Sequence, residues 1–141
     1  KSSAASDVYK RQSIMYEKAK EVLQERQISK FIEAGSVAAA IKTVTGNIYV
    51  GVCFDTSCSL GMCAERNAVF GAYCKGYRKE DIIGLAIVAD CSPIASPCGA
   101  CRQVLSELVD LEMPIFLANK EKVEKHTIGE LLPMVFIGES L

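Results

Sequence analysis

Three cysteines at fixed spacing constrain the fold of this chain more than any other feature. Cys63 stands two residues before Glu65, and 31 residues separate Glu65 from Pro97, which opens the run Pro-Cys-Gly-Ala-Cys. Residues three apart on a helix share a face, so Cys98 and Cys101 lie together if a helix begins here. Cys63 opens a second predicted helix. All three thiols are therefore expected at helix N-termini, where the helix dipole favours a thiolate.

Hydrophobic periodicity and turn residues predict alternating helices and strands. The predicted helices cover Tyr16–Gln27, Met62–Lys75, Pro97–Asp110 and Thr127–Leu132. The predicted strands cover Val37–Lys42, Ile48–Phe54, Ile82–Ala89 and Pro114–Ala118. Thr45-Gly46-Asn47 indicates a hairpin, Gly76 ends the second helix, and Ser96 and Pro97 are expected at the N-cap and first position of the third. This order predicts one α/β layered domain around a mixed sheet.

The cysteine pattern is typical of a catalytic zinc site. Such a site uses three protein ligands and leaves a fourth position open for water. The only histidine, His126, lies outside the pattern, so Cys63, Cys98 and Cys101 are the predicted ligands of one Zn²⁺ per subunit. A structural zinc site would need a fourth ligand at ligand spacing, and the sequence supplies none. The remaining cysteines are predicted to be small buried hydrophobes: they are Cys53, Cys58, Cys74 and Cys91.

Glu65 completes the signature of the zinc deaminases, in which a glutamate lies two residues after the first ligand and a Pro-Cys-x-x-Cys run follows. Zinc supplies hydroxide at neutral pH, which would attack C4 of a cytosine-like ring. Glu65 is the predicted proton shuttle, from water to ring N3 and then to the departing amine. Arg66 is expected to offset the negative charge of three thiolates by hydrogen bonding to sulfur.

Charge and composition exclude several partners. The formal net charge is −1, and the sequence has no cluster of lysine and arginine, so a nucleic acid is not an expected partner. No apolar run approaches the roughly 20 residues of a membrane helix, so we expect no membrane span. Seven cysteines and the lack of a charged-then-apolar leader predict a cytoplasmic protein with free or metal-bound thiols.

Residues 1–14 are expected to be a non-native segment that precedes the catalytic domain, residues 15–141. The run Asp7 to Gln12 reads as the translated end of a common sequencing-library transposon adapter. Met15 is the expected natural start, and the segment before it is excluded from the fold prediction.

The chain resembles the cytidine deaminases that act on free nucleosides, and blasticidin-S deaminase among them. The resemblance covers about residues 37–136 and is most specific at Cys63-Ala64-Glu65-Arg66, at Ser96 to Val104 and at Gly129-Glu130-Leu131-Leu132-Pro133. It implies an α/β/α sandwich of three layers around a five-stranded mixed sheet, and a homotetramer or homodimer. It also implies hydrolytic deamination of cytidine or deoxycytidine in pyrimidine salvage, with release of ammonia.

Two alternatives stay open at this point. One is a deaminase of another aminopyrimidine nucleoside, such as blasticidin S. The other is a zinc-stabilised binding module without turnover, against which the presence of Glu65 speaks.

Two departures from the family pattern concern the sugar. Members of the family carry Asn-x-Glu on the second strand to bind the ribose hydroxyls, whereas this chain has Cys53-Phe54-Asp55. The family's aromatic residue before the first strand has only Phe31 as a counterpart here. The resemblance therefore implies Cys53, Asp55, Ala64 and Ser96 as substrate-binding residues, with weaker recognition of the sugar.

Overall fold

The structure of this protein is a computed structural model that describes residues 13–138. A helix over residues 13–22 opens the described chain. The elements that follow are β1 (Arg26–Ser29), β2 (Ile32–Thr43), β3 (Ile48–Asp55), α2 (Ala64–Cys74), a 3₁₀ turn (Lys79–Asp81), β4 (Ile82–Ala89), α3 (Gly99–Leu108), β5 (Ile115–Ala118), β6 (Val123–His126) and α4 (Ile128–Leu131). The predicted non-native segment lies outside the described residues except for residues 13 and 14, and its origin stays a prediction.

The strands form one mixed sheet. Its order is β1-β2-β4-β5-β6, and β3 pairs with the other edge of β2. β2 is antiparallel to β1, β3 and β4, and β5 is antiparallel to β6. β4 and β5 are parallel and are joined through α3, the long crossover that parallel strands require. The predicted α/β fold with a mixed sheet is confirmed, and the sheet has six strands where five were expected.

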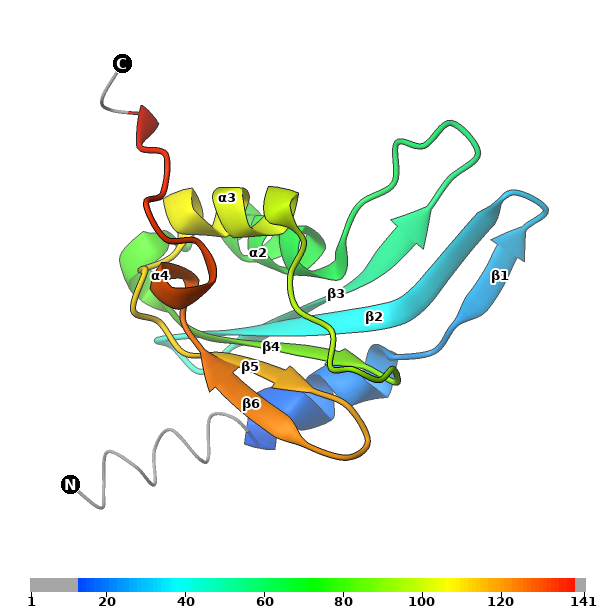
Figure 1. Cartoon of the computed structure of the whole chain (residues 1–141), viewed down its shortest axis with the longest axis horizontal. Coiled ribbons are helices and arrows are strands. Elements are labelled where there is room, and N and C mark those ends of the chain that lie inside the picture. The colour runs from blue at the N-terminus through cyan, green and yellow to red at the C-terminus, as the bar shows by residue number, and fades with distance from the viewer. Residues whose placement is uncertain (1–12, 139–141) are drawn as a thin grey trace.

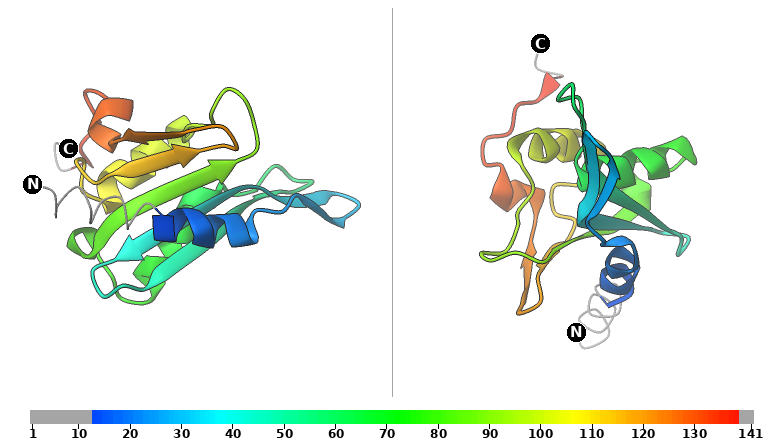
Figure 2. Two further views of the ribbon diagram at one scale, coloured as in Figure 1. Left: turned by 90° about the horizontal axis from the view of Figure 1, so that it is seen from below. Right: turned by 90° about the vertical axis from the view of Figure 1, so that its right-hand side faces the viewer.

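Helices cover both faces of the sheet (Figures 1 and 2). α2 and α3 pack on one face, where Ala68 and Leu105 lie in a fully buried cluster. The helix over residues 13–22 packs on the other face, where Met15 and Ala19 contact a second cluster that includes Phe116. β4 has apolar layers on both sides, which explains why its sequence is a continuous apolar run, as predicted.

Strand direction brings the two predicted helix N-termini to one edge of the sheet. β3 and β4 are both antiparallel to β2, so they run in the same direction and end at the same edge. α2 follows β3 and α3 follows β4, so both helices begin at that edge (Figure 1). The carboxyl ends of strands in layered α/β folds are the usual place of ligand binding.

The predicted elements differ from the structure in several places, and β2 begins at Ile32 rather than at Val37. The first helix ends at residue 22 and not at Gln27, because the chain turns there and enters β1. β1 and β6 were not predicted, since neither strand shows an apolar alternation; both are short edge strands with exposed or half-buried residues. α3 begins at Gly99 with Cys98 as N-cap, so Ser96 and Pro97 precede the helix.

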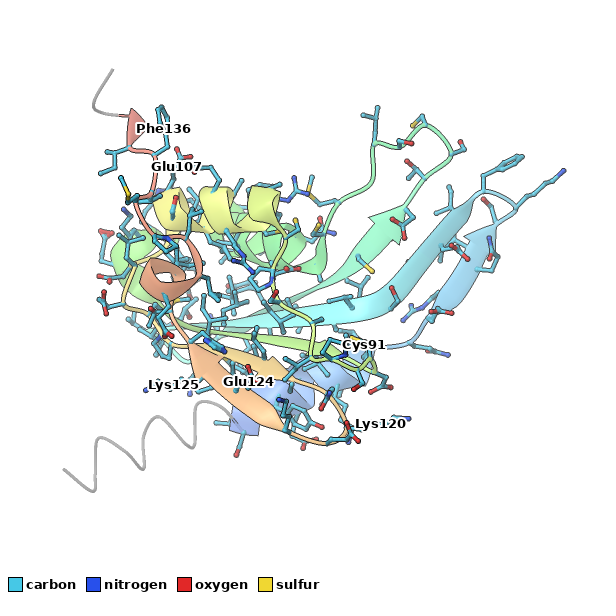
Figure 3. All side chains as sticks on the ribbon, viewed as in Figure 1. Cys91, Glu107, Lys120, Glu124, Lys125 and Phe136 are labelled. Carbon is cyan, nitrogen blue, oxygen red and sulfur yellow. The ribbon has the colours of Figure 1, made fainter. Side chains whose placement is uncertain are left out.

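The prediction that the four remaining cysteines are buried is also wrong. Cys53 is half-buried, and Cys58, Cys74 and Cys91 are exposed. Cys53 lies within β3, and the three exposed cysteines lie in the segment after β3, at the last residue of α2 and after β4. Figure 3 shows Cys91 at the surface near Lys120 of the segment between β5 and β6, where the side chain of Asn119 donates to the Cys91 carbonyl at 2.9 Å.

The close approach of α2 to β3 depends on Gly51. A Cβ at this position would lie 2.7 Å from both the Ala64 oxygen and the Ala68 nitrogen of α2. Gly51→Ala should therefore lower the free energy of unfolding by about 1–3 kcal/mol, the range for overpacking, as measured by urea denaturation. Gly71→Ala is the matched control. Gly71 lies within α2, and a Cβ added there would have no neighbouring atom within 4 Å, so the variant should stabilise the protein by roughly 0.5–1 kcal/mol. A neutral Gly51→Ala would show that α2 can shift without cost.

No helix within residues 13–138 is long and apolar enough to cross a membrane.

Candidate active site

Cys63 and Cys98 are the N-cap residues of α2 and α3. Both have extended backbone, with φ and ψ of −75° and 154° at Cys63 and −68° and 169° at Cys98. Their carbonyl oxygens accept the first helical hydrogen bonds, from Asn67 at 3.2 Å and from Arg102 at 2.9 Å. Cys101 follows in the first turn of α3 and is buried. The structure therefore places the three thiols at the N-termini of two helices, as predicted.

The three sulfur atoms lie close enough to share a metal ion. The Sγ atoms of Cys63, Cys98 and Cys101 are all within 4.8 Å of one another, and those of Cys63 and Cys98 are 3.6 Å apart. Two thiolates on a tetrahedral Zn²⁺ with Zn–S bonds of about 2.3 Å would be about 3.8 Å apart. The thiol spacing therefore fits zinc, and the cluster can hold a metal ion with three protein ligands.

Glu65 is the only charged residue that is buried within residues 13–138. It is 5% exposed and lies in the first turn of α2. Burial raises the pKa of its carboxyl above the ordinary value, against the lowering effects of its own backbone N–H, a hydrogen bond with Cys101 and the charge of Arg66. A carboxyl that is buried beside the sulfur cluster suits proton transfer in that space.

Arg66 lies against the sulfur cluster from the side of α2. Its Nη2 donates to the Cys63 sulfur at 3.4 Å. Hydrogen bonds with Cys63 and Cys101 raise the pKa of the guanidinium, so it stays charged. Its Nε is buried and has no hydrogen-bond partner within the described residues. The prediction that Arg66 donates to thiolate sulfur is matched by this contact.

The pKa values of the Cys98 and Cys101 thiols are shifted in opposite directions. Burial raises the pKa of the Cys101 thiol, and the charge of Glu65 adds to that effect. Burial alone would also raise the pKa of the Cys98 thiol, but hydrogen bonds with the Cys101 backbone N–H and the Cys63 side chain lower it overall. A bound cation would favour thiolates at both positions.

A hollow of about 350 Å³ opens beside Cys63. Cys53 and Asp55, the predicted sugar-binding residues, lie in its wall together with Cys63. The Asp55 carboxylate is exposed and makes no hydrogen bond or ion pair with residues 13–138, so it is free to accept from a ligand. Gly61 borders the same hollow, and a Cβ there would overlap the Phe54 carbonyl oxygen, so the turn between β3 and α2 depends on glycine.

Ala64 and Ser96, the other two predicted substrate-binding residues, differ in which groups they can offer to a ligand. The side chain of Ala64 is fully buried, which leaves only its backbone to contact a ligand. The Ser96 hydroxyl is exposed and accepts a hydrogen bond from Arg102 Nη2 at 3.1 Å. Phe31 is 62% exposed at the turn between β1 and β2 and lines no part of the hollow beside Cys63.

Arg102 and Asn67 hold the site together, and the cysteine pattern does not reveal their roles. Arg102 also donates to the carbonyl oxygens of Pro97 at 2.7 Å and Leu131 at 2.6 Å, which ties the segment before Cys98 to α4. Asn67 donates from α2 to the Val52 carbonyl of β3 at 2.7 Å. Both residues lie within a turn of a predicted cysteine ligand, and Arg102 also lies in the stretch Ser96 to Val104 that carries the resemblance.

Several known proteins are similar to this chain in sequence and in fold. A cytidine deaminase of Sporosarcina psychrophila is 43% identical to the chain over 107 residues, which cover 74% of this chain and 77% of that protein. The chain belongs to the cytidine deaminase family. A second member, from Halalkalibacterium halodurans, is 36% identical over 129 residues, which cover 86% of this chain and 93% of that protein.

Solved structures agree with this membership. The crystal structure of a cytidine deaminase from Burkholderia pseudomallei matches this chain with a TM-score of 0.77 and 33% sequence identity, and the match covers 88% of this chain and 98% of that chain.

Blasticidin-S deaminase of Bacillus cereus is less similar in sequence, at 31% identity over 108 residues that cover 71% of this chain and 76% of that protein. No protein-family model matches the chain.

Proposed function

We propose that this protein hydrolyses cytidine and deoxycytidine to uridine and deoxyuridine, with release of ammonia. The observation that carries the proposal is the meeting of three thiols and the buried Glu65 carboxyl at one edge of the sheet, in a member of the cytidine deaminase family. The role that follows is nucleoside salvage in the cytoplasm, since seven cysteines with no disulfide among them suit a reducing environment.

In this proposal each residue of the cluster has a separate task. Cys63, Cys98 and Cys101 hold one Zn²⁺, which when bound lowers the pKa of water to about 7 and so supplies hydroxide at neutral pH. Glu65 would pass one proton of the attacking water to ring N3 and the second, from the hydroxyl added at C4, to the departing amine, which leaves as ammonia. Arg66 offsets the excess negative charge of three thiolates through its bond to Cys63.

The hollow beside Cys63 is the proposed place of the nucleoside. Cys53 and Asp55, which line this hollow, would contact the sugar. The backbone at Ala64 and the Ser96 hydroxyl, which lie outside its lining, would border the base. The thiol of Cys53 is a weak donor and acceptor, and the Asp55 carboxylate is the stronger partner for a hydroxyl.

Ammonia release from a panel of substrates tests the function. Purified protein should release ammonia from cytidine and deoxycytidine, and more slowly from cytosine, which offers no sugar to Asp55 or Cys53. Release from blasticidin S alone would replace the proposed substrate with the antibiotic. Release from none of the four compounds would leave a zinc-stabilised binding module and overturn the enzymatic function.

Blasticidin S is the second candidate because of one observation. Cys53 and Asp55 leave a wall with a free carboxylate and no amide at the sugar end of the hollow. Such a wall also suits a substituent other than a plain ribose, and a blasticidin-S deaminase is among the relatives.

We further propose that the protein is a homotetramer or homodimer. A second hollow of about 900 Å³ shares Phe54 and Met62 with the hollow beside Cys63, and its apolar lining also includes Ile28, Val50 and Leu60. Leu60 is 81% exposed and Phe54 is 40% exposed. Exposed apolar surface of this kind is a common subunit interface, and light scattering measures the assembly.

A further inference from the structure

A bulge in β2 lies opposite the sugar-facing residue Cys53. Ala38 of β2 pairs with Val52 of β3, but the next pair in register is Ala34 with Phe54. Residues 35–37 therefore stand across from Cys53 alone. A bulge bends its strand and changes the direction of a side chain, and bulges occur often beside active sites.

Gly35 makes this bulge possible. Its φ of +90° is a conformation that side chains with a Cβ rarely adopt. A Cβ at this position would also overlap the carbonyl oxygen of Gln24. The backbone can therefore follow this path only with glycine here, and the next residue, Ser36, takes the direction that the bulge gives it.

The bulge directs Ser36 toward the active-site face of the sheet. Val37 packs against the cluster under α2 and α3, and successive residues of a regular strand point to opposite faces. A regular β2 would therefore point Ser36 away from α2. Instead its Oγ lies 3.2 Å from the Cys53 sulfur, which is in the wall of the hollow beside Cys63. Ser36 itself is exposed and borders a separate hollow of about 410 Å³, so its hydroxyl is open to a ligand.

We propose that Ser36 binds the 2′- or 3′-hydroxyl of the nucleoside sugar and determines, with Cys53, how strongly the sugar is recognised. The inference rests on the proposed function. The reacting base carbon must face the cysteine cluster, so the sugar extends from Cys63 along β3 toward Cys53. When the Ser36 hydroxyl donates to the Cys53 sulfur, its two lone pairs remain to accept from the sugar. Ser36 thereby supplies a strong hydrogen-bonding group next to a weak thiol, and Asp55 accepts from a second hydroxyl.

Ser36→Ala tests the contact through its dependence on the substrate. The KM for cytidine should rise about 2–12-fold, the equivalent of one neutral hydrogen bond. The kcat should change by less than about twofold, because the contact is made equally in the ground and transition states. 2′,3′-Dideoxycytidine keeps the 5′-hydroxyl but lacks the 2′- and 3′-hydroxyls, so with this substrate the variant and the unaltered protein should have the same KM. Ser36→Thr retains a hydroxyl and should restore most of the affinity for cytidine.

Ser29→Ala is the matched control. Ser29 is an exposed serine of β1 whose hydroxyl accepts from the Phe31 N–H at 3.4 Å, outside the hollow. Its removal should leave all kinetic constants unchanged, and melting temperatures should confirm that both alanine variants are folded. An equal loss with cytidine and dideoxycytidine, or no loss with cytidine, would overturn the role of Ser36. No ammonia release by the unaltered protein would overturn the proposed function, and this inference with it.

Discussion

Glu65→Gln should reduce the turnover of cytidine by roughly 10²–10⁴-fold, the usual contribution of a general acid–base residue. Glutamine has nearly the same shape as glutamate but cannot accept and return a proton. Glu65 is a proton shuttle in the proposed mechanism and not a zinc ligand, so the variant should keep its metal. Because the site is 5% exposed and glutamine fills the same volume, the fold should also be retained. Steady-state kinetics, metal analysis and thermal unfolding measure the three quantities.

Glu107→Gln controls for the general effect of removing a carboxylate. Glu107 is exposed on α3, away from the sulfur cluster, and accepts from Gln103 at 3.1 Å (Figure 3). Its variant should have normal turnover. Turnover of Glu65→Gln within a few-fold of the unaltered protein would contradict the assignment of the proton shuttle.

Cys98→Ala should abolish stoichiometric zinc binding. The unaltered protein should contain about one zinc per subunit, and loss of a direct ligand should weaken binding by more than the ~10–100-fold that loss of an outer partner costs. A metal present at 100 times its Kd stabilises the folded state by about 2.7 kcal/mol. Each kcal/mol corresponds to roughly 2–8 °C in Tm for domains near this size, so the Tm should fall by at least about 5 °C.

Cys91→Ala and a chelator separate the metal from the cysteine side chain. Cys91 is an exposed cysteine outside the cluster, so its variant should keep both zinc and Tm. Unaltered protein stripped by a chelator should melt at the temperature of Cys98→Ala, since exposed Cys98 contributes little packing of its own. A Cys98→Ala protein with one zinc and an unchanged Tm would contradict the proposed ligand set.

Much of the fold could be predicted from local sequence. The apolar run Ile82–Ala89 matches β4 at both ends, because a strand covered on two faces has no polar side to interrupt it. Gly76, with φ of +97°, ends α2 as expected, and Thr127 caps α4 by accepting from the Glu130 N–H. Each of these features depends on residues within a few positions of one another.

The start of α3 could not be predicted in the same way. Ser96 and Pro97 form a good local N-terminus, yet the Ser96 hydroxyl is bonded to Arg102 and Cys98 is the N-cap. A guanidinium six residues along, itself bonded to Leu131 of α4, outweighs the local preference. β6 was missed for a related reason, since its order comes from pairing with β5 rather than from its own pattern.

The sequence by itself determined which side chains carry the proposed chemistry: Cys98 and Cys101 at helical spacing, and Glu65 two residues after Cys63. Such spacings are local, so they do not depend on how the helices and strands are arranged in space. Only the tertiary structure decided that Cys63 meets Cys98, since β3 and β4 must both pair with β2 to end at one edge. It also decided that Ser36 faces Cys53, because the bulge depends on the close approach of Gly35 to Gln24. Contacts of this kind join distant segments, so they form only when the strands between those segments pair in the sheet.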